Sequence, residues 1–194
     1  MSDLPVMQFE SPDQFRKWLH TNHAKSTGIW LRFFKKASGK KTFAYAQALD
    51  EALCYGWIDG QARPGDADSY LQRFTPRRAK SKWSKRNRDH VARLEKEGRM
   101  KPAGLREVER AKADGRWDAA YDSPSSMTLP ADFVAELGKK KYAKAKKFLE
   151  SLPKANKYMI AYRLQDAKKP ETRAKRMAEY LERLSRGEPL VVRS

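Results

Sequence analysis

This sequence is poor in cysteine, in histidine and in long apolar stretches. Its one cysteine, Cys54, excludes an internal disulfide and a cysteine-rich metal site. Of three histidines, His20 and His23 could share a helix face, but no third ligand is evident near them, so we expect no metal site. No stretch approaches the ~18 apolar residues of a membrane span, and the N-terminus lacks the basic start and apolar run of a secretory signal. We therefore expect a reduced, cytoplasmic, soluble protein without a transmembrane segment.

The common signature motifs of nucleotide, metal and nucleophile sites are also missing. The sequence contains neither GxxxxGK(S/T) nor GxGxxG, and it has no HExxH, CxxC or GxSxG. We therefore expect no cofactor, and no motif assigns a catalytic residue.

Positive charge, in contrast, is abundant and unevenly distributed. The chain has 42 Lys or Arg against 24 Asp or Glu, a formal net charge of +18. Residues 1–75 carry a balance of only +2, whereas residues 76–116 carry +9 and residues 117–194 carry +7. A charge of this size predicts attraction to polyanions such as nucleic acid, acidic proteins or anionic lipid.

The most concentrated positive charge lies between Arg73 and Arg88, in the sequence RFTPRRAKSKWSKRNR, here called the basic segment. It contains eight Lys or Arg and no acid. Like charges repel, so an anionic partner is the simplest reason to gather them, and each Arg can pair with phosphate or carboxylate. The candidate anion-binding residues are Arg73, Arg77, Arg78, Lys80, Lys82, Trp83, Lys85, Arg86 and Arg88. Trp83 could serve as a stacking platform or anchor the segment to the core.

Further candidates for a pocket lie beside this segment. In DEALCYGWIDG, Asp59 falls at a helix-to-strand junction, where it could orient Arg73 or Arg77 or simply bind turn amides. Cys54 in the same stretch is more typical of a buried structural thiol than of a nucleophile. The pocket candidates are Trp57, Asp59, Ser84 and Asn87.

Residue spacing predicts an α+β fold. A small antiparallel or mixed sheet with two helices comes first, followed by a mostly helical C-terminal portion. The expected strands are Val6–Phe9, Gly28–Lys36, Trp57–Ala62 and Ser69–Phe74, the last two forming a hairpin. Helices are expected from Pro12, over Ala44–Tyr55, from Ser84 to Glu97, from Pro102 to Asp114, and over Pro130–Gly138, Tyr142–Ser151, Lys154–Lys168 and Pro170–Gly187.

The expected organisation is a small α+β unit over residues 1–75, followed by the basic segment and helical portion over 76–187. These two parts could form a single domain. A loop is expected at 123–126 and a tail at 188–194.

Several motifs together resemble a known family. EALCYGWIDG, YLQRFTPRR, SKWSKRN, GRMKPAG, AKADGRW and AKKPETRAKR occur in this order, and the series resembles the YdeI/OmpD-associated family, whose C-terminal region is labelled bacteriocin-protection. The resemblance extends from about Phe15 to Gly187. It implies a role in tolerance of antimicrobial peptides or in stress response, and it assigns no catalytic residues.

Three functional hypotheses remain open. The first is a binding module for an anionic ligand, with nucleic acid ahead of a phosphate- or carboxylate-bearing molecule. The second is an enzyme in which Asp59 and arginines line a small pocket around an anionic substrate. The third is an interaction protein for an acidic partner or an anionic lipid surface. The oligomeric state is left open.

Overall fold

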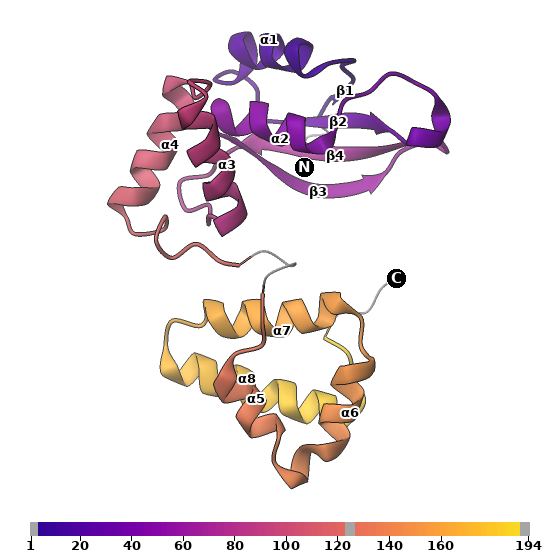
Figure 1. Cartoon of the computed structure of the whole chain (residues 1–194), viewed down its shortest axis with the longest axis vertical. Coiled ribbons are helices and arrows are strands. Elements are labelled where there is room, and N and C mark those ends of the chain that lie inside the picture. The colour runs from indigo at the N-terminus through magenta and orange to yellow at the C-terminus, as the bar shows by residue number, and fades with distance from the viewer. Residues whose placement is uncertain (1–3, 123–126, 191–194) are drawn as a thin grey trace. The chain divides into compact units, whose positions relative to one another are not determined.

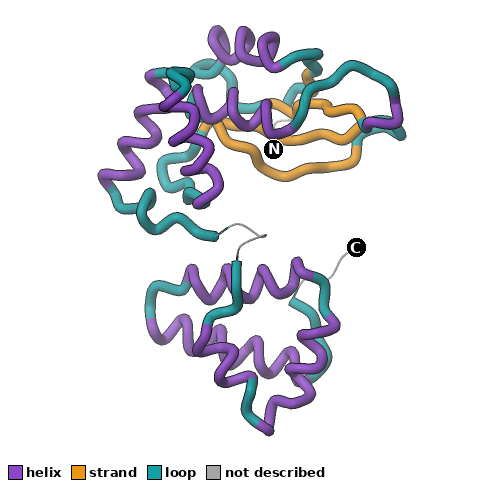
Figure 2. Tube along the Cα trace, in the orientation of Figure 1, coloured by secondary structure: helices purple, strands orange, loops and turns teal. Residues whose placement is uncertain are grey.

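The chain forms two compact units in the computed structural model (Figure 1), which describes residues 4–122 and 127–190. Unit 1 comprises Met1–Ala120 and unit 2 comprises Tyr121–Ser194. Within the described residues, strands occur in unit 1 alone, and unit 2 consists of helices and loops (Figure 2). The α+β class expected from the sequence is confirmed. The predicted loop at 123–126 and the last four residues of the predicted tail lie outside the described residues.

Unit 1 is built on a four-stranded mixed sheet with the strand order β1-β2-β4-β3. The two-residue β1 (Val6–Met7) pairs in parallel with β2 (Ile29–Phe34), and the other pairs are antiparallel. The predicted hairpin is confirmed as β3 (Trp57–Pro64) and β4 (Ser69–Pro76), whose strands run two residues further than expected. Because β3 is the last strand of the sheet, its edge away from β4 is not covered by another strand and can contribute to a site.

Two helices cover one face of this sheet. In β2 every second residue is buried, and Phe33 stacks on Tyr70 of β4. Helix α1 (Pro12–Asn22) begins where Ser11 accepts the Gln14 N–H, and its Phe15 packs against Phe74 of β4. Helix α2 (Tyr45–Cys54) contributes further side chains to the same core. Two short 3₁₀ turns, at Lys36–Ser38 and Lys140–Tyr142, were not expected from the sequence.

The residues after the hairpin also belong to unit 1. Helices α3 (Lys85–Lys96) and α4 (Pro102–Ala113) pack on α2, with Val91 and Val108 fully buried. Gly104 makes the approach of α4 possible, because a Cβ there would lie 2.4 Å from the Cys54 carbonyl oxygen. The structural division therefore falls after Ala120, whereas the sequence analysis divided the chain after residue 75, where the charge balance changes.

Two acids on α2 are held by cations from the neighbouring helices and loop. Glu51 is 1% exposed and pairs with Arg16 Nε at 2.9 Å and with Arg99 Nη2 at 2.7 Å. Asp50 accepts hydrogen bonds at 2.7 Å from His90 Nδ1 and from Arg93 Nη2. These contacts tie α1, α3 and the α3–α4 loop to α2.

Unit 2 has its own apolar core. It contains α5 (Ala131–Leu137), α6 (Ala143–Ser151), α7 (Lys154–Asp166) and α8 (Pro170–Ser185). The buried side chains come from all four helices and include Phe133, Leu149, Ile160 and Leu181. Each of these helices was expected within one or two residues of its observed bounds. Across the residues that the structure describes, no helix is both long enough and apolar enough to span a membrane.

Candidate functional site

The basic segment runs from the middle of β4, through a loop, into α3. Its eight cations do not form one patch. Two are packed into the protein, namely Arg77 and Arg88. Three line a single pocket, namely Arg73, Arg78 and Lys80. The remaining three, namely Lys82, Lys85 and Arg86, are exposed outside this pocket, and Arg78 and Lys80 are exposed as well.

Arg77 and Trp83 form a buried stack. The Arg77 guanidinium carbon lies 3.5 Å from the centre of the Trp83 ring, and Nη1 of Arg77 donates to the Lys82 carbonyl at 3.2 Å. Trp83 is 2% exposed and packs edge-on against Trp117. Of the two roles expected for Trp83, the anchor therefore fits its position, because a ring this deeply buried offers no surface to a base.

Other candidates also contribute to local structure. Ser84 caps α3 by accepting the backbone N–H of Asn87 at 3.1 Å. Trp57 is 1% exposed and donates its indole N–H to the His23 carbonyl at 3.0 Å. Arg88 donates to the Trp117 carbonyl at 2.9 Å. None of these side chains lines the pocket that Arg73 and its neighbours form.

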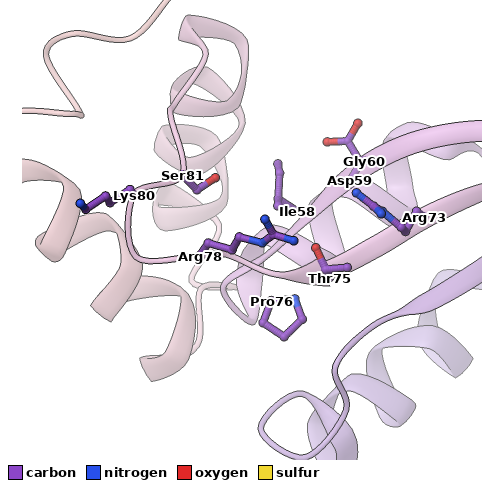
Figure 3. Close-up of a pocket in the computed structure, with 9 residues that line it drawn as sticks. All are labelled: Ile58, Asp59, Gly60, Arg73, Thr75, Pro76, Arg78, Lys80 and Ser81. Atoms are coloured by element: carbon purple, nitrogen blue, oxygen red, sulfur yellow. The ribbon is translucent and has the colours of Figure 1, made fainter. Parts of the chain in front are cut away.

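That pocket, here called the edge pocket, has a volume of about 310 Å³ and lies between edge strand β3, the end of β4 and the following loop (Figure 3). Figure 3 shows the guanidinium groups of Arg73 and Arg78 pointing toward each other from opposite sides, whereas the ammonium group of Lys80 points away. The pocket is lined by Ile58, Asp59, Gly60, Arg73, Thr75, Pro76, Arg78, Lys80 and Ser81.

A bulge in the hairpin positions Arg73. The β3–β4 register shifts between Asp59 and Ala62, and a Cβ at Gly60 would lie 2.9 Å from Arg73 Nε. The absence of a side chain at Gly60 therefore lets the guanidinium lie against β3. Arg73 Nε is buried without a hydrogen-bond partner. Among the described residues, neither Arg73 nor Arg78 makes an ion pair.

The loop that carries Arg78 is fixed at both ends. The backbone N–H of Arg77 donates to the Gly56 carbonyl at 2.9 Å, and Arg116 Nη1 donates to the Ser81 carbonyl at 2.7 Å. The Arg77–Trp83 stack adds a third attachment to the core. The two packed residues of the basic segment thus hold the loop in place, and Arg78 extends from it into the edge pocket.

Asp59 is oriented by a tyrosine. Tyr45 Oη, at the start of α2, donates to Asp59 Oδ2 at 2.7 Å. Burial, and then the hydrogen bond to Asp59, raise the pKa of Tyr45 far above its usual value, so the phenol stays protonated and donates. Asp59 makes no ion pair with Arg73 or Arg77 in the described part of the chain, so neither arginine is its orienting partner.

Sequence reasoning missed several of these residues. Thr75 could have been found, because it lies two positions after Arg73 on one strand and so projects from the same face. Tyr45 carried no such signal, since fourteen residues separate it from Asp59 and only the packing of α2 on the sheet brings them together.

Elsewhere in the part of the chain that the structure describes, neither a metal site nor a reactive thiol is indicated. Cys54 is buried, and burial raises the pKa of its thiol to about 12, so it is protonated at neutral pH. His23 Nδ1 lies 2.9 Å from the Leu19 carbonyl. In residues 4–122 and 127–190 there is no group of three or more His, Cys, Asp or Glu side chains that could hold a metal ion.

Two family models match different parts of the chain. The first, described as Domain of unknown function (DUF8412), matches residues 7–107, which include the whole edge pocket. The second, described as Bacteriocin-protection, YdeI or OmpD-Associated (OmdA), matches residues 126–187. No curated protein and no solved structure matches the chain significantly. The resemblance stated from the sequence is thus confirmed, but the OmdA match covers unit 2 and not the range from Phe15 onward. The chain therefore belongs to the DUF8412 family and carries an OmdA region after it.

Proposed function

We propose that unit 1 binds a small anion, bearing a phosphate or carboxylate group, in the edge pocket. The observation that carries this proposal is the convergence of Arg73 and Arg78, neither ion-paired among the described residues, on one cavity of about 310 Å³. This volume is near the lower end of the ~300–1,000 Å³ typical of small-molecule sites.

An anion would relieve two costs of this arrangement. Two guanidinium groups that face each other repel, and an anion between them turns that repulsion into attraction. Arg73 Nε is a buried donor without a partner, which costs free energy until an acceptor reaches it. Phosphate and carboxylate oxygens match the planar donor geometry of arginine.

Nucleic acid is a less favoured ligand for this chain. The charge of the basic segment supports it, and Lys82, Lys85 and Arg86 are exposed. However, Trp83 is buried and cannot stack on a base, and Arg77 and Arg88 are already packed against tryptophans. A short single-stranded oligonucleotide that binds with a steep salt dependence and is not displaced by phosphate would favour nucleic acid instead.

An enzyme acting on the same anion is a less favoured function. Asp59 pairs across the hairpin with the buried Phe74, and its carboxylate accepts the Tyr45 hydroxyl on the helix-covered face. Figure 3 shows this carboxylate pointing away from Arg73 and Arg78, which is a poor position for a general base toward an anion that they bind. Turnover of a bound phosphate ester that is lost in Asp59→Asn, while binding is kept, would support this function.

The OmdA region suggests a link to bacteriocin protection. We propose that any such protection is an indirect consequence of ligand binding. A chain with a net charge of +18 repels cationic peptides, so direct capture of such a peptide is disfavoured.

The binding proposal is tested by calorimetric titration of the full chain with inorganic phosphate and with pyrophosphate. We expect both to bind, and we expect Arg73→Ala and Arg78→Ala each to weaken binding by about tenfold, because each removes a charge-assisted hydrogen bond. Arg106→Ala is the matched control, because it removes an exposed arginine outside the edge pocket. No binding to the wild-type chain, or equal weakening in all three variants, would contradict the proposal.

A further inference from the structure

We infer that the ligand of the edge pocket is a nucleoside monophosphate, whose phosphate lies between Arg73 and Arg78 and whose base stacks on a neighbouring pair, Trp30 and Arg63. This inference rests on the proposed anion binding and specifies the chemical class of the ligand: a phosphate joined through a short spacer to a planar aromatic ring.

Trp30 lies on the sheet face opposite the one that α1 and α2 cover. Its neighbours in β2, Ile29 and Leu31, are fully buried in the core shared with those helices. Side chains alternate along a strand, so Trp30 projects to the other face, where it is half-buried. Its register partner on β4 is Arg73. Directly opposed side chains of antiparallel strands start about 5 Å apart, so Trp30 lies beside an arginine of the edge pocket.

Arg63 stacks on the Trp30 ring from edge strand β3. Its Cζ lies 4.1 Å from the centre of the ring, although β4 separates the two strands, so the two side chains meet over β4. We call this pair the Trp30–Arg63 platform. Arg63 is exposed, so the outer side of its guanidinium group is open to a ligand. A guanidinium plane is a surface on which a nucleobase can stack.

The positive charge of the platform is not neutralised by a neighbouring acid. On the same sheet face Arg32 is paired with Asp66, whereas Arg63 makes no ion pair within residues 4–122 and 127–190. The platform therefore offers positive charge and aromatic surface together. Sites that bind the bases of single-stranded nucleic acids combine the same two features.

The separation between the edge pocket and the platform favours a ligand with a spacer. Arg63 pairs with Leu71, which lies two residues from Arg73 along β4, a step of about 7 Å. A phosphate held in the edge pocket therefore needs a linker before a ring can reach the platform. The ribose of a nucleoside monophosphate supplies this linker, whereas in phenyl phosphate the ring follows the phosphate directly.

The experiment compares three probes by calorimetric titration of the full chain: adenosine monophosphate, ribose 5-phosphate and phenyl phosphate. The first two share the phosphate and the sugar and differ by the base. We expect adenosine monophosphate to bind about tenfold more tightly than ribose 5-phosphate, because base stacking adds to the anion contact. Phenyl phosphate should bind less tightly than adenosine monophosphate, because its ring does not reach the platform.

Three variants assign the gain from the base to the platform. Arg63→Lys keeps the positive charge but removes the flat guanidinium surface, so it should lower the ratio of the two affinities about threefold and leave the ribose 5-phosphate affinity unchanged. Trp30→Leu should make the two affinities nearly equal. Arg78→Ala should weaken both probes alike and keep their ratio, because it acts on the phosphate.

Phe34→Leu is the matched control. Phe34 is a half-buried ring on the same strand and face as Trp30, four residues further along and outside the edge pocket, so its loss should keep the full ratio. Thermal melting of each variant reports whether it is folded. Because Arg63 is exposed, Arg63→Lys remains a valid test if Trp30→Leu does not fold. Equal loss of the ratio in Phe34→Leu and Arg63→Lys would overturn the inference, since the effect would then be general.

The outcomes separate this inference from the proposal beneath it. If adenosine monophosphate and ribose 5-phosphate bind equally well, or if Arg63→Lys keeps their ratio, the inference is overturned while anion binding stands. If phenyl phosphate binds most tightly, no spacer is needed and the nucleoside assignment is wrong. If inorganic phosphate binds and none of the three probes does, the inference alone fails. If inorganic phosphate does not bind either, the proposed function fails with it.

Discussion

The guanidinium group of Arg77 lies flat over the ring of Trp83, with its central carbon 3.5 Å from the ring centre. Both residues are buried, at 6% and 2% exposure. This stack fixes the loop from which Arg78 reaches the edge pocket, so one arginine of the basic segment has a structural role and the next one lines the pocket. Adjacent residues with the same chemistry therefore differ in what their substitution should do.

Arg77→Ala should destabilise the fold without removing the anion site. Loss of a desolvated cation–π contact and of the hydrogen bond to the Lys82 carbonyl should lower the free energy of unfolding by about 2 kcal/mol. Urea unfolding measures this change. Arg78→Ala should change the free energy of unfolding by less than about 0.5 kcal/mol. Arg77→Lys should recover only part of the loss, since an ammonium group lacks the flat guanidinium surface. Equal stability of Arg77→Ala and Arg78→Ala would contradict this division of roles.

Gly60→Ala should weaken anion binding more than it weakens the fold. A Cβ at this position meets the flexible end of Arg73 at 2.9 Å, so the guanidinium can move aside at little cost to the backbone. We expect phosphate affinity to fall about fivefold, with the free energy of unfolding changed by less than about 0.5 kcal/mol.

Gly104→Ala provides the opposite control for this prediction. Its Cβ would lie 2.4 Å from a backbone carbonyl of Cys54, which cannot move aside, so about 2 kcal/mol of stability should be lost. If Gly60→Ala destabilises the fold as strongly as Gly104→Ala does, Arg73 is not free to move as proposed.

Glu51→Gln should be among the costly polar substitutions in unit 1. Glu51 is 1% exposed and paired with Arg16 and Arg99. Removing its charge leaves each guanidinium group with a single, more exposed acid, Asp13 for Arg16 and Glu97 for Arg99. We expect a loss of about 2 kcal/mol, below the ~3–5 kcal/mol of a fully buried pair, because both arginines retain access to water. Glu109→Gln is the control, since Glu109 forms an exposed pair with Lys112 and its loss should cost less than about 0.5 kcal/mol.

The buried thiol should make stability depend on alkaline pH. Burial raises the pKa of Cys54 from its usual value near 9 to about 12. Below pH 9 the thiol is neutral in both folded and unfolded chains, so its contribution is fully present. Between pH 9 and pH 12 only the unfolded chain ionises, so that contribution is lost as the pH rises.

Cys54→Ala measures this effect, because tyrosines that titrate in the same range are common to both proteins. Urea unfolding at pH 8, 9 and 10 should show the wild-type chain losing stability relative to Cys54→Ala, by at most about 1.4 kcal/mol per pH unit. Parallel stability curves for the two proteins would show that the thiol ionises equally in folded and unfolded chains.

Much of the local structure could be read from residue spacing. The aromatic and β-branched residues of Gly28–Lys36, bounded by glycines, predicted β2, and Ser84 correctly marked the start of α3. The hairpin followed from its turn residues, and the helices of unit 2 followed from apolar spacing and from Pro and Gly at their ends. Such features depend on neighbours within a few residues, so the sequence displays them directly.

The division of the chain into units was harder to predict. The charge balance changes after residue 75, and the sequence analysis placed a boundary there. However, α3 and α4 bury Val91, Leu94, Val108 and Ala111 in the core of unit 1. Net charge reports the solvent-facing side of a helix, whereas the assignment to a unit depends on the apolar side.

The sequence by itself determined that this protein gathers positive charge after its hairpin, that Asp59 lies close to that charge along the chain, and that no disulfide supports the fold. Only the tertiary structure decided which cations share a pocket, since the missing side chain at Gly60 leaves room for Arg73 against β3 and the stack on Trp83 keeps Arg77 out of the pocket. It also decided the partner of Asp59, a tyrosine on another element. The direction of a side chain depends on strand register and helix packing, which join residues far apart in the chain, and so local spacing cannot reveal it.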